Sequence, residues 1–342
     1  MISNTEYFKL YSTCMVVRGA RRSSIYDLEK EEYHYVPNGM SEIIELLKKD
    51  SYLDVLKSFE PSDQNTIKEY ITFLLNKDLG FFTPRPELYP DMELKYETFN
   101  TITNAIIDRN ESSSYDLYAA IEQLDNLKCQ DLQLRFYSKV EIEYLDQVMA
   151  FLSQTEIRSV EIFVPFNQVR KSVVGKFINK WPKIKLLLIH SAPKSEVIHL
   201  NKNNFYTSNQ GNVLVTEEII SSENNCGCIS KSFFSINVES YTESNLYNSC
   251  LHKKIGIDSG GNIRNCPSLT RQFGPVDKTQ ISDVILTDEF KSYSKITKDQ
   301  INVCKDCEHR YMCTDCRAFV TDIHAKPAKC GYNPYLAKWE TN

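Results

Sequence analysis

The sequence predicts an α/β protein in three parts: a winged-helix-like α+β domain, a partial (β/α) barrel and a cysteine-rich C-terminal domain. Three observations support this fold class. Strand-like segments precede helical ones within residues 1–86. Strand and helix patterns then alternate over residues 95–218. Nine of the 11 cysteines lie between Cys226 and Cys330, in a third part that we place at residues 226–342.

The first part, residues 1–86, begins with strand signals and continues with helix signals. Aromatic and β-branched residues predict three strands, at 7–17, 24–28 and 33–36. Apolar residues at helical spacing then predict two short helices and a third that starts at Pro61 and ends at Gly80. A short edge strand at 81–83 closes this part, before a linker that contains two prolines. A three-stranded ribbon followed by three helices is a winged-helix-like arrangement.

The second part, residues 95–218, repeats strand–helix units of about 25 to 30 residues, a length typical of (β/α) barrels. Apolar runs predict four strands, at 101–107, 132–137, 159–165 and 184–190. Helical spacing predicts three helices between them, at 116–127, 141–152 and 168–179. Right-handed crossovers would join these strands into a parallel sheet, either open or curled into a partial barrel. Cys14 and Cys129 lie apart from the other cysteines, and we expect both to be small buried core residues.

The third part begins with a predicted hairpin between two cysteines. Strands at 255–258 and 262–264 flank a Ser-Gly-Gly turn, with Cys250 and Cys266 at the outer ends. A hairpin brings its ends together, so these two cysteines can share one metal site.

Five further cysteines follow at short, regular spacings, as Cys304-x2-Cys307-x5-Cys313-x2-Cys316 and then Cys330. C-x2-C pairs are typical of metal-binding turns, and an odd total of cysteines argues against a complete set of disulfides. Zinc is the alternative metal. Zinc ribbons separate their pairs by about 15 to 20 residues, whereas the short gap here favours ligands wrapped around an iron–sulfur cubane.

Composition and charge exclude several functional classes. The net charge of -5 gives no general attraction to nucleic acid. The sequence contains neither a P-loop nor a dinucleotide-binding glycine motif. Its longest apolar run, at 186–189, is far shorter than the ~20 residues of a transmembrane helix, and we see no secretory signal. We therefore expect a cytoplasmic protein with no membrane and no nucleic-acid partner.

The cysteine pattern of the third part resembles the SPASM domain, the auxiliary iron–sulfur module of many radical peptide-modifying enzymes. Gly261, five residues before Cys266, matches the hairpin glycine of that family. The resemblance implies two [4Fe–4S] clusters. The first would take Cys250, Cys266 and Cys316, with Cys226 or Cys228 as fourth ligand, and the second would take Cys304, Cys307, Cys313 and Cys330. The sequence departs from the family at Cys316, which follows Cys313 after two residues where the family has three.

The second part resembles the barrel of a radical S-adenosylmethionine enzyme that lacks its cluster motif. Such an enzyme carries C-x3-C-x2-C in the loop after its first barrel strand, but the loop here, residues 108–114, contains no cysteine. We therefore expect a degenerate barrel and no cleavage of S-adenosylmethionine.

Taken over its whole length, the chain resembles the SPASM-domain peptide maturases of grasp-with-spasm systems. This resemblance implies a role in maturing ribosomally made peptides, beside a partner ATP-grasp ligase. The first part resembles the precursor recognition elements of such systems, at segments 25–28, 33–36 and 77–80. These elements bind a leader peptide as an added β-strand.

Two functional hypotheses stay open on the sequence alone. In the first, the protein is an iron–sulfur peptide maturase that binds a precursor peptide. In the second, it is a non-catalytic adaptor whose cysteines hold zinc or clusters for structural reasons only. His252 and His309 lie near the cysteines, and we expect them to stand behind the metal ligands or to be exposed.

Overall fold

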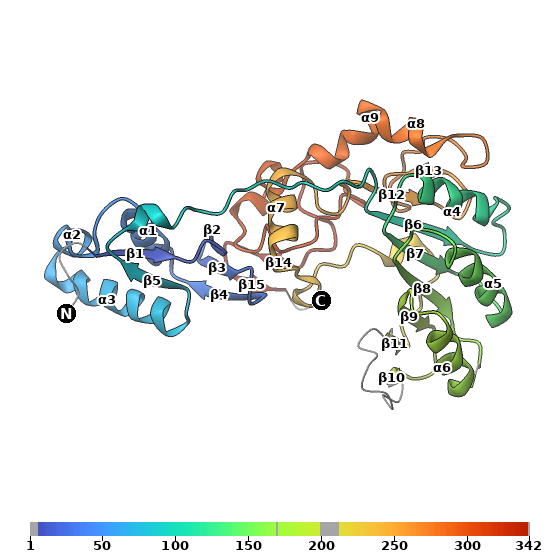
Figure 1. Cartoon of the computed structure of the whole chain (residues 1–342), viewed down its shortest axis with the longest axis horizontal. Coiled ribbons are helices and arrows are strands. Elements are labelled where there is room, and N and C mark those ends of the chain that lie inside the picture. Colours follow the sequence, from blue (N-terminus) through green and yellow to red (C-terminus); the bar gives the residue numbers. More distant parts are fainter. Residues whose placement is uncertain (1–5, 169, 199–211, 341–342) are drawn as a thin grey trace.

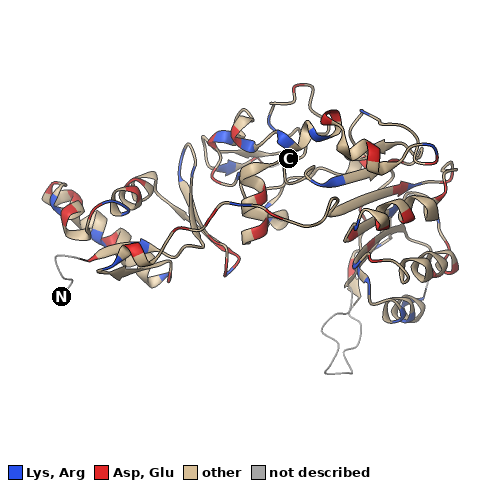
Figure 2. Ribbon diagram, turned by 45° about the horizontal axis from the view of Figure 1, so that its top comes forward, with Lys and Arg blue, Asp and Glu red and all other residues tan. Residues whose placement is uncertain are grey.

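The computed structural model describes residues 6–168, 170–198 and 212–340. Part of the predicted barrel, at 199–211, therefore lies outside the described residues. The first part of the chain and the large sheet lie at opposite ends of an elongated molecule, and the cysteine-rich segments lie between them (Figure 1). Lys and Arg are interspersed with Asp and Glu along the ribbon (Figure 2), which fits the small net charge.

The first part contains five strands and three helices among the described residues. The strands are β1 (Tyr7–Leu10), β2 (Cys14–Arg18), β3 (Ser23–Asp27), β4 (Glu32–Val36) and β5 (Gly80–Thr83). The helices are α1 (Asn38–Leu47), α2 (Tyr52–Lys57) and α3 (Pro61–Asn76). Strands β2, β3 and β4 form an antiparallel sheet, with β4 at one edge. Apolar residues of the helices pack on it, around Ile25, Ile44 and Leu74.

The prediction of one strand at 7–17 is wrong. The amide of Cys14 donates to the carbonyl of Tyr11 over 2.9 Å, and this turn divides the segment into β1 and β2. The two strands join different sheets, because β1 pairs with β5 whereas β2 pairs with β3. Cys14 is buried in the core of this part, as expected.

An eight-stranded, mostly parallel sheet forms the other end of the molecule, with the order β10-β11-β9-β8-β7-β6-β12-β13. Its strands are β6 (Asn104–Arg109), β7 (Asp131–Phe136), β8 (Ser159–Pro165), β9 (Ile184–His190), β10 (Glu196–Ile198), β11 (Asn212–Val215), β12 (Lys254–Ile257) and β13 (Ile263–Arg264). The connecting helices are α4 (Leu117–Asn126), α5 (Ile142–Leu152) and α6 (Lys171–Lys180). The prediction of an α/β fold with a parallel sheet is therefore confirmed, and the first strand lies slightly later than predicted.

The three crossover helices cover one face of this sheet (Figure 1). Buried apolar residues of the strands alternate with residues of the opposite face, and residues such as Leu132, Leu134 and Ile162 pack against the helices. Cys129 is buried in this core, as expected. The other face carries Asn104, Gln133 and other polar residues and is turned toward the cysteine-rich segments. The sheet is therefore layered with helices on one side only.

The cysteine-rich part consists mainly of loops and short elements. They include α7 (Val238–Leu246), α8 (Ile281–Leu286), α9 (Asp288–Lys291), β14 (Tyr332–Asn333) and β15 (Lys338–Trp339). The predicted hairpin is present as β12 and β13, but β12 also pairs in parallel with β6. The large sheet thus contains strands from both sides of the division that we predicted between residues 218 and 226.

No helix among the described residues combines the length and the apolar character that a membrane span needs.

Candidate metal centres

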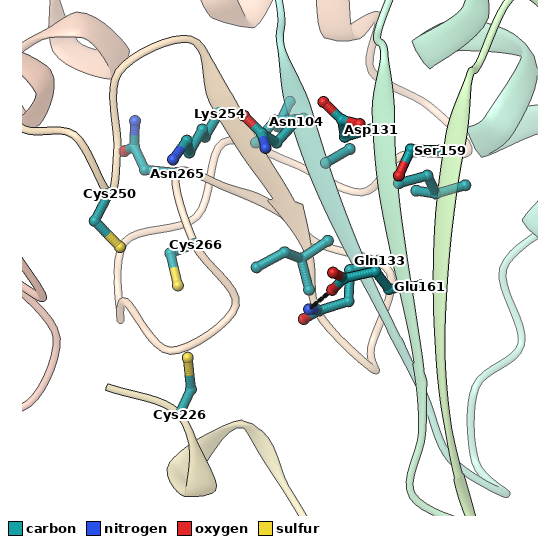
Figure 3. Close-up of a pocket in the computed structure, with 14 residues that line it drawn as sticks. Asn104, Asp131, Gln133, Ser159, Glu161, Cys226, Cys250, Lys254, Asn265 and Cys266 are labelled. Atoms are coloured by element: carbon teal, nitrogen blue, oxygen red, sulfur yellow. Dashed lines mark hydrogen bonds between the residues drawn. The ribbon is translucent and has the colours of Figure 1, made fainter. Parts of the chain in front are cut away.

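Four cysteines from three separate segments of the chain come together beside the open face of the sheet. We call them the first quartet: Cys226, Cys250, Cys266 and Cys316. Cys226, Cys250 and Cys266 line one cavity of about 280 Å³, and their sulfur atoms point into the same space (Figure 3). Cys316 interacts electrostatically with Cys250 and Cys226. Burial raises the pKa of Cys250 to about 12, and the neighbouring thiols add to the shift.

The first quartet depends on two close glycine contacts. Gly261 adopts a φ of +81° in the hairpin turn, and a Cβ atom there would lie 2.9 Å from the Tyr115 side chain. Gly227 adopts a φ of +86°, and a Cβ atom there would lie 2.9 Å from the sulfur of Cys316. Glycine at 227 therefore lets the segment that carries Cys226 approach Cys316. The Nζ of Lys329 also donates to the carbonyl of Cys226 over 2.6 Å.

The structure separates the two cysteines between which the sequence could not decide. Cys226 lines the cavity with Cys250 and Cys266, whereas Cys228 is exposed. The next residue, Ile229, forms a parallel β-bridge with Cys330. The chain therefore passes from Cys226, past Cys316, to a bridge beside Cys330.

The remaining four cysteines form a second group, which we call the second quartet: Cys304, Cys307, Cys313 and Cys330. Burial raises the pKa of Cys304 to about 12 and that of Cys313 to about 11, and Cys304 also interacts with Cys313 and Cys330. The pKa of Cys307 is raised as well, first by burial and further by its neighbours. The turn is held by main-chain bonds from Cys307 to Cys304 and from Cys313 to His309, each 3.0 Å long.

Both quartets have the donor chemistry of a metal centre. Several thiols with raised pKa values lie together in buried or half-buried positions, where ionised sulfurs would repel one another. A bound cation removes that repulsion and draws off the protons, because metals bind the thiolate form.

The described residues contain no compact group of three thiols of the kind that surrounds a zinc ion. A tetrahedral zinc with Zn–S bonds near 2.3 Å would hold its sulfurs roughly 3.8 Å apart. Within the described residues, no three cysteines bring their sulfurs within 4.8 Å of one another. The group that meets this limit is Cys307, Glu308 and His309. These are consecutive residues, and Arg22 and Tyr332 already bind Glu308.

A polar wall of the sheet faces the first quartet across the cavity. It contains Asn104, Asp131, Gln133 and Glu161 (Figure 3). The amide of Gln133 donates to the carboxylate of Glu161 over 2.7 Å. Burial raises the pKa of Asp131. The cavity thus has thiols on one side and carboxylates and amides on the other.

A buried ion pair stands at the carboxyl ends of β6 and β7, where a radical S-adenosylmethionine enzyme would have its cysteine loop. The guanidinium of Arg135 donates two hydrogen bonds to the carboxylate of Asp108, at 2.6 and 2.8 Å. The hydroxyl of Tyr137 adds a third at 2.8 Å. Arg135 also lowers the pKa of Cys266, against the larger effect of burial. This pair was not predicted, although an arginine within the strand at 131–136 was a signal for it.

The two histidines near the cysteines are both buried, so of the two expected positions, behind the ligands or exposed, the exposed one is excluded. His252 stacks on the ring of Tyr247 and contacts Glu243 at 3.1 Å. His309 lies directly behind Cys307, because its main-chain amide donates to that sulfur over 3.4 Å. Burial lowers the pKa of His309 to about 4, so its ring is neutral at neutral pH.

Comparisons with known proteins give a structural likeness and no sequence match. No protein-family model and no curated protein matches the sequence. One similar solved structure is Streptococcus suis SuiB bound to S-adenosylmethionine, with 9% identity, a TM-score of 0.38 and coverage of 95% of this chain and 98% of that one. Another is SuiB bound to the precursor peptide SuiA, with 10% identity, a TM-score of 0.32 and coverage of 96% and 98%. TM-scores this low carry no argument about the fold or function of this chain.

Proposed function

We propose that this protein is an iron–sulfur protein of ribosomal peptide maturation, with one four-iron cluster at each quartet. One observation carries the metal part of the proposal. Eight of the nine clustered cysteines sort into two groups of four, and the thiols within each group interact. Cys228 is the cysteine that is left over, and it is exposed.

The sulfur spacing supports iron–sulfur clusters over single zinc ions. A cubane places its four ligands at separate corners, so its thiolates stand farther apart than those around one ion. Such a cluster, with a cysteine on each iron, would supply electron transfer to groups in the cavity. Arg135, beside the first quartet, would balance part of its negative charge.

The peptide part of the proposal rests on the resemblance of the first part to precursor recognition elements. Strand β4 is an edge strand of its sheet, so its outer side can accept an extended peptide through main-chain hydrogen bonds. The polar cavity beside the first quartet would then receive a side chain of that peptide. In this proposal an ATP-grasp ligase works on the same precursor as a partner.

A structural role is the second candidate, and one observation favours it for the second quartet. The loop between Cys304 and Cys313 is bonded to the first part of the chain, through contacts such as Ala20 to Asp306 at 2.7 Å. A metal there would brace the two parts against each other. The adaptor hypothesis therefore applies to this centre more than to the first quartet.

Metal analysis tests the proposal. We expect the protein purified without oxygen to contain about eight iron and eight sulfide per chain, the content of two [4Fe–4S] clusters. Zinc without acid-labile sulfide would contradict it. The matched variants are Cys226→Ser and Cys228→Ser. The first should lose about half of the iron and the second should keep it all.

Two further assays test the proposed activity. Incubation with S-adenosylmethionine under reducing conditions should give no 5′-deoxyadenosine above a control without protein, since residues 108–114 offer no thiolate. A labelled precursor leader peptide should bind the full chain with a Kd in the micromolar range, roughly -8 kcal/mol. Release of 5′-deoxyadenosine, or no peptide binding, would contradict the corresponding part of the proposal.

A further inference from the structure

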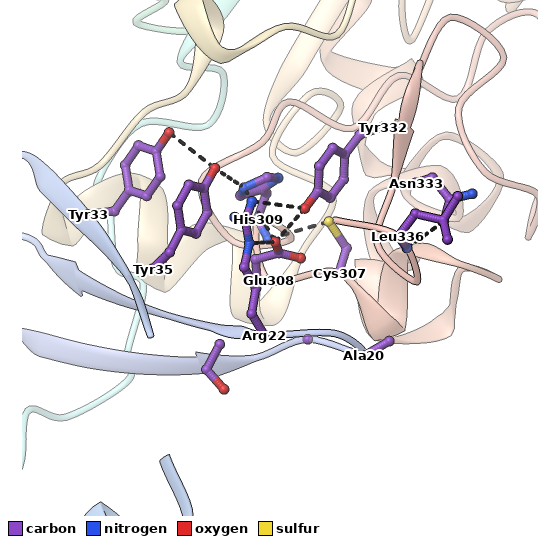
Figure 4. Close-up of polar contacts among 12 residues, drawn as sticks. Ala20, Arg22, Tyr33, Tyr35, Cys307, Glu308, His309, Tyr332, Asn333 and Leu336 are labelled. Atoms are coloured by element: carbon purple, nitrogen blue, oxygen red, sulfur yellow. Dashed lines mark hydrogen bonds and ion pairs between the residues drawn. The ribbon is translucent and has the colours of Figure 1, made fainter. Parts of the chain in front are cut away.

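The first part of the chain is bonded to the loop between Cys304 and Cys313 of the second quartet. The side chain of Arg22 forms an ion pair of 2.7 Å with Glu308, whose carboxylate also accepts from Tyr332. The hydroxyl of Tyr26 donates to the carbonyl of Glu308 over 2.6 Å. Arg310 donates to the carbonyl of Arg18 at the same distance. Strands β2 and β3 and the turn between them are therefore fixed to this loop (Figure 4).

Within the described part of the chain, strand β4 makes one polar contact with the same loop, through Tyr35. The hydroxyl of Tyr35 lies 2.8 Å from Nε2 of His309, and the guanidinium of Arg22 lies 3.3 Å from the centre of the Tyr35 ring. The Tyr35 side chain thus stands between an arginine of the first part and a histidine of the cysteine-rich part (Figure 4).

His309 continues this contact to a predicted metal ligand. Its main-chain amide donates to the sulfur of Cys307 over 3.4 Å. Its ring is only 1% exposed and lies against Phe234 and Tyr332, with centres 5.0 and 4.5 Å apart. Among the described residues, Nδ1 of this ring has no hydrogen-bond partner. The bond to Tyr35 is therefore the polar contact that orients the ring.

We propose that Tyr35 and His309 are positioning residues for the second metal centre, and that they couple the mobility of β4 to metal binding at that centre. Metal bound at Cys307 would hold the amide of His309 in place. The ring of His309 would then hold the side chain of Tyr35, and Tyr35 would hold the edge strand β4. The coupling is reciprocal, because whatever holds β4 in place also favours the metal-bound loop. This inference rests on the proposed function in one respect only, namely that the second quartet holds a metal.

Amide hydrogen exchange of the full-length protein tests the coupling without any peptide. We expect exchange in β4 to be about tenfold slower in the metal-loaded than in the metal-free protein, because a fixed strand opens less often. In Tyr35→Phe this ratio should fall below about twofold, since the ring stays while the bond to His309 is lost. Strand β1, which lies away from the loop, should exchange equally in all samples.

The metal itself provides the second readout. Loss of iron to a chelator should be about threefold to tenfold faster in Tyr35→Phe, below the 10- to 100-fold effect of groups bonded directly to a ligand. The measurement is made in a Cys250→Ser background, so that the remaining cluster belongs to the second quartet. Tyr335→Phe is the matched control, because it removes an exposed hydroxyl that bonds Asp306 of the same loop over 2.7 Å. It should behave like the parent.

The outcomes separate this inference from the proposed function. A parent protein that binds metal, with a Tyr35→Phe variant that matches it in both exchange and iron loss, would overturn the coupling and leave the proposed function standing. A parent protein without metal at the second quartet would overturn both. Should Tyr35→Phe fold poorly, His309→Gln and His309→Ala replace it. The glutamine amide can still reach Tyr35 and should retain part of the coupling, whereas alanine should abolish it.

Discussion

The two quartets share one kind of ligand and differ in what surrounds them. The first lies beside a cavity of about 280 Å³, opposite the polar face of the large sheet. The second lies against aromatic rings and against the sheet of the first part, with His309 buried between them. The difference teaches that ligand identity does not determine the role of a thiol site. Access also differs between the two, and under the proposed function it favours substrate chemistry at the first quartet and bracing at the second.

Arginine–carboxylate pairs with a buried carboxylate lie beside both quartets. Arg135 and Asp108 stand beside the first, and Arg22 and Glu308 stand beside the second. Asp108 and Glu308 are both fully buried. The side chain of Arg22 is 27% exposed, whereas that of Arg135 is 6% exposed. The pair beside the first quartet is therefore the more sensitive to the loss of its cation.

Arg135→Ala should cause the largest loss of folding stability. It leaves the carboxylate of Asp108 buried without its cation, which costs roughly 3 to 5 kcal/mol of unfolding free energy. Arg22→Ala should cost less, because water reaches its site. Urea denaturation measures both, with Lys139→Ala as control, since its pair with Glu141 is exposed. Equal losses for Arg135→Ala and Arg22→Ala would remove this distinction between the quartets.

Gly227→Ala should have the next largest effect. A side chain at a φ of +86° is strained and would meet the sulfur of Cys316, at a cost of about 1 to 3 kcal/mol. The iron of the first quartet should be released faster while that of the second is unchanged. Gly39→Ala is the control, because that position lies in α1 and its nearest contact would be 3.5 Å away. If release from both quartets changes together, the two centres are not independent.

Lys329→Met should have a smaller effect. It removes the bonds from the lysine Nζ to the carbonyls of Asn224 and Cys226, on an exposed side chain. We expect iron to leave the first quartet about twofold to fivefold faster, as the loss of these exposed hydrogen bonds would allow. Chelator kinetics measure this, with Lys305→Met as the control on the loop of the second quartet. An unchanged rate would mean that Gly227 alone positions the segment.

The dependence of folding stability on pH is the smallest effect at neutral pH, and it becomes measurable at alkaline pH. In the metal-free protein, burial raises the pKa of Cys250 to about 12, above the ordinary value of 9.0. Between these values the unfolded chain has released a proton that the folded chain keeps, so stability falls as pH rises from 9 to 12. Thermal unfolding across this range should show a steeper decline without metal than with it. The same slope in both forms would exclude thiol ionisation as the cause.

Local sequence patterns were sufficient to predict the strands and turns that are marked by apolar segments between polar or turn residues. Strands Ser159–Pro165 and Ile184–His190 lie where they were predicted, because each is an apolar run bounded by polar or turn residues. The hairpin at Gly261 was predictable for the same reason. The division of residues 7–17 was missed, since the pattern of apolar residues continues through the turn at Tyr11.

Contacts between distant segments were beyond sequence analysis. The pairing of β12 with β6 joins segments whose local patterns carry no information about each other. The choice between Cys226 and Cys228 depended on the approach of Gly227 to Cys316, which is a tertiary contact. The contact of Tyr35 with His309 spans 274 positions, and both residues are individually typical of a core.

The pairing of β12 with β6 has a consequence for synthesis of the protein. Thr103, just before β6, bonds to a residue 150 positions later, and Arg22 bonds to one 286 positions later. A nascent chain emerging from the ribosome can form its central strands and helices early, yet both ends of the molecule remain incomplete until the cysteine-rich segment appears. During that interval the edge of β6 and the aromatic side chains of the first part are exposed, which makes the partly made chain prone to aggregation.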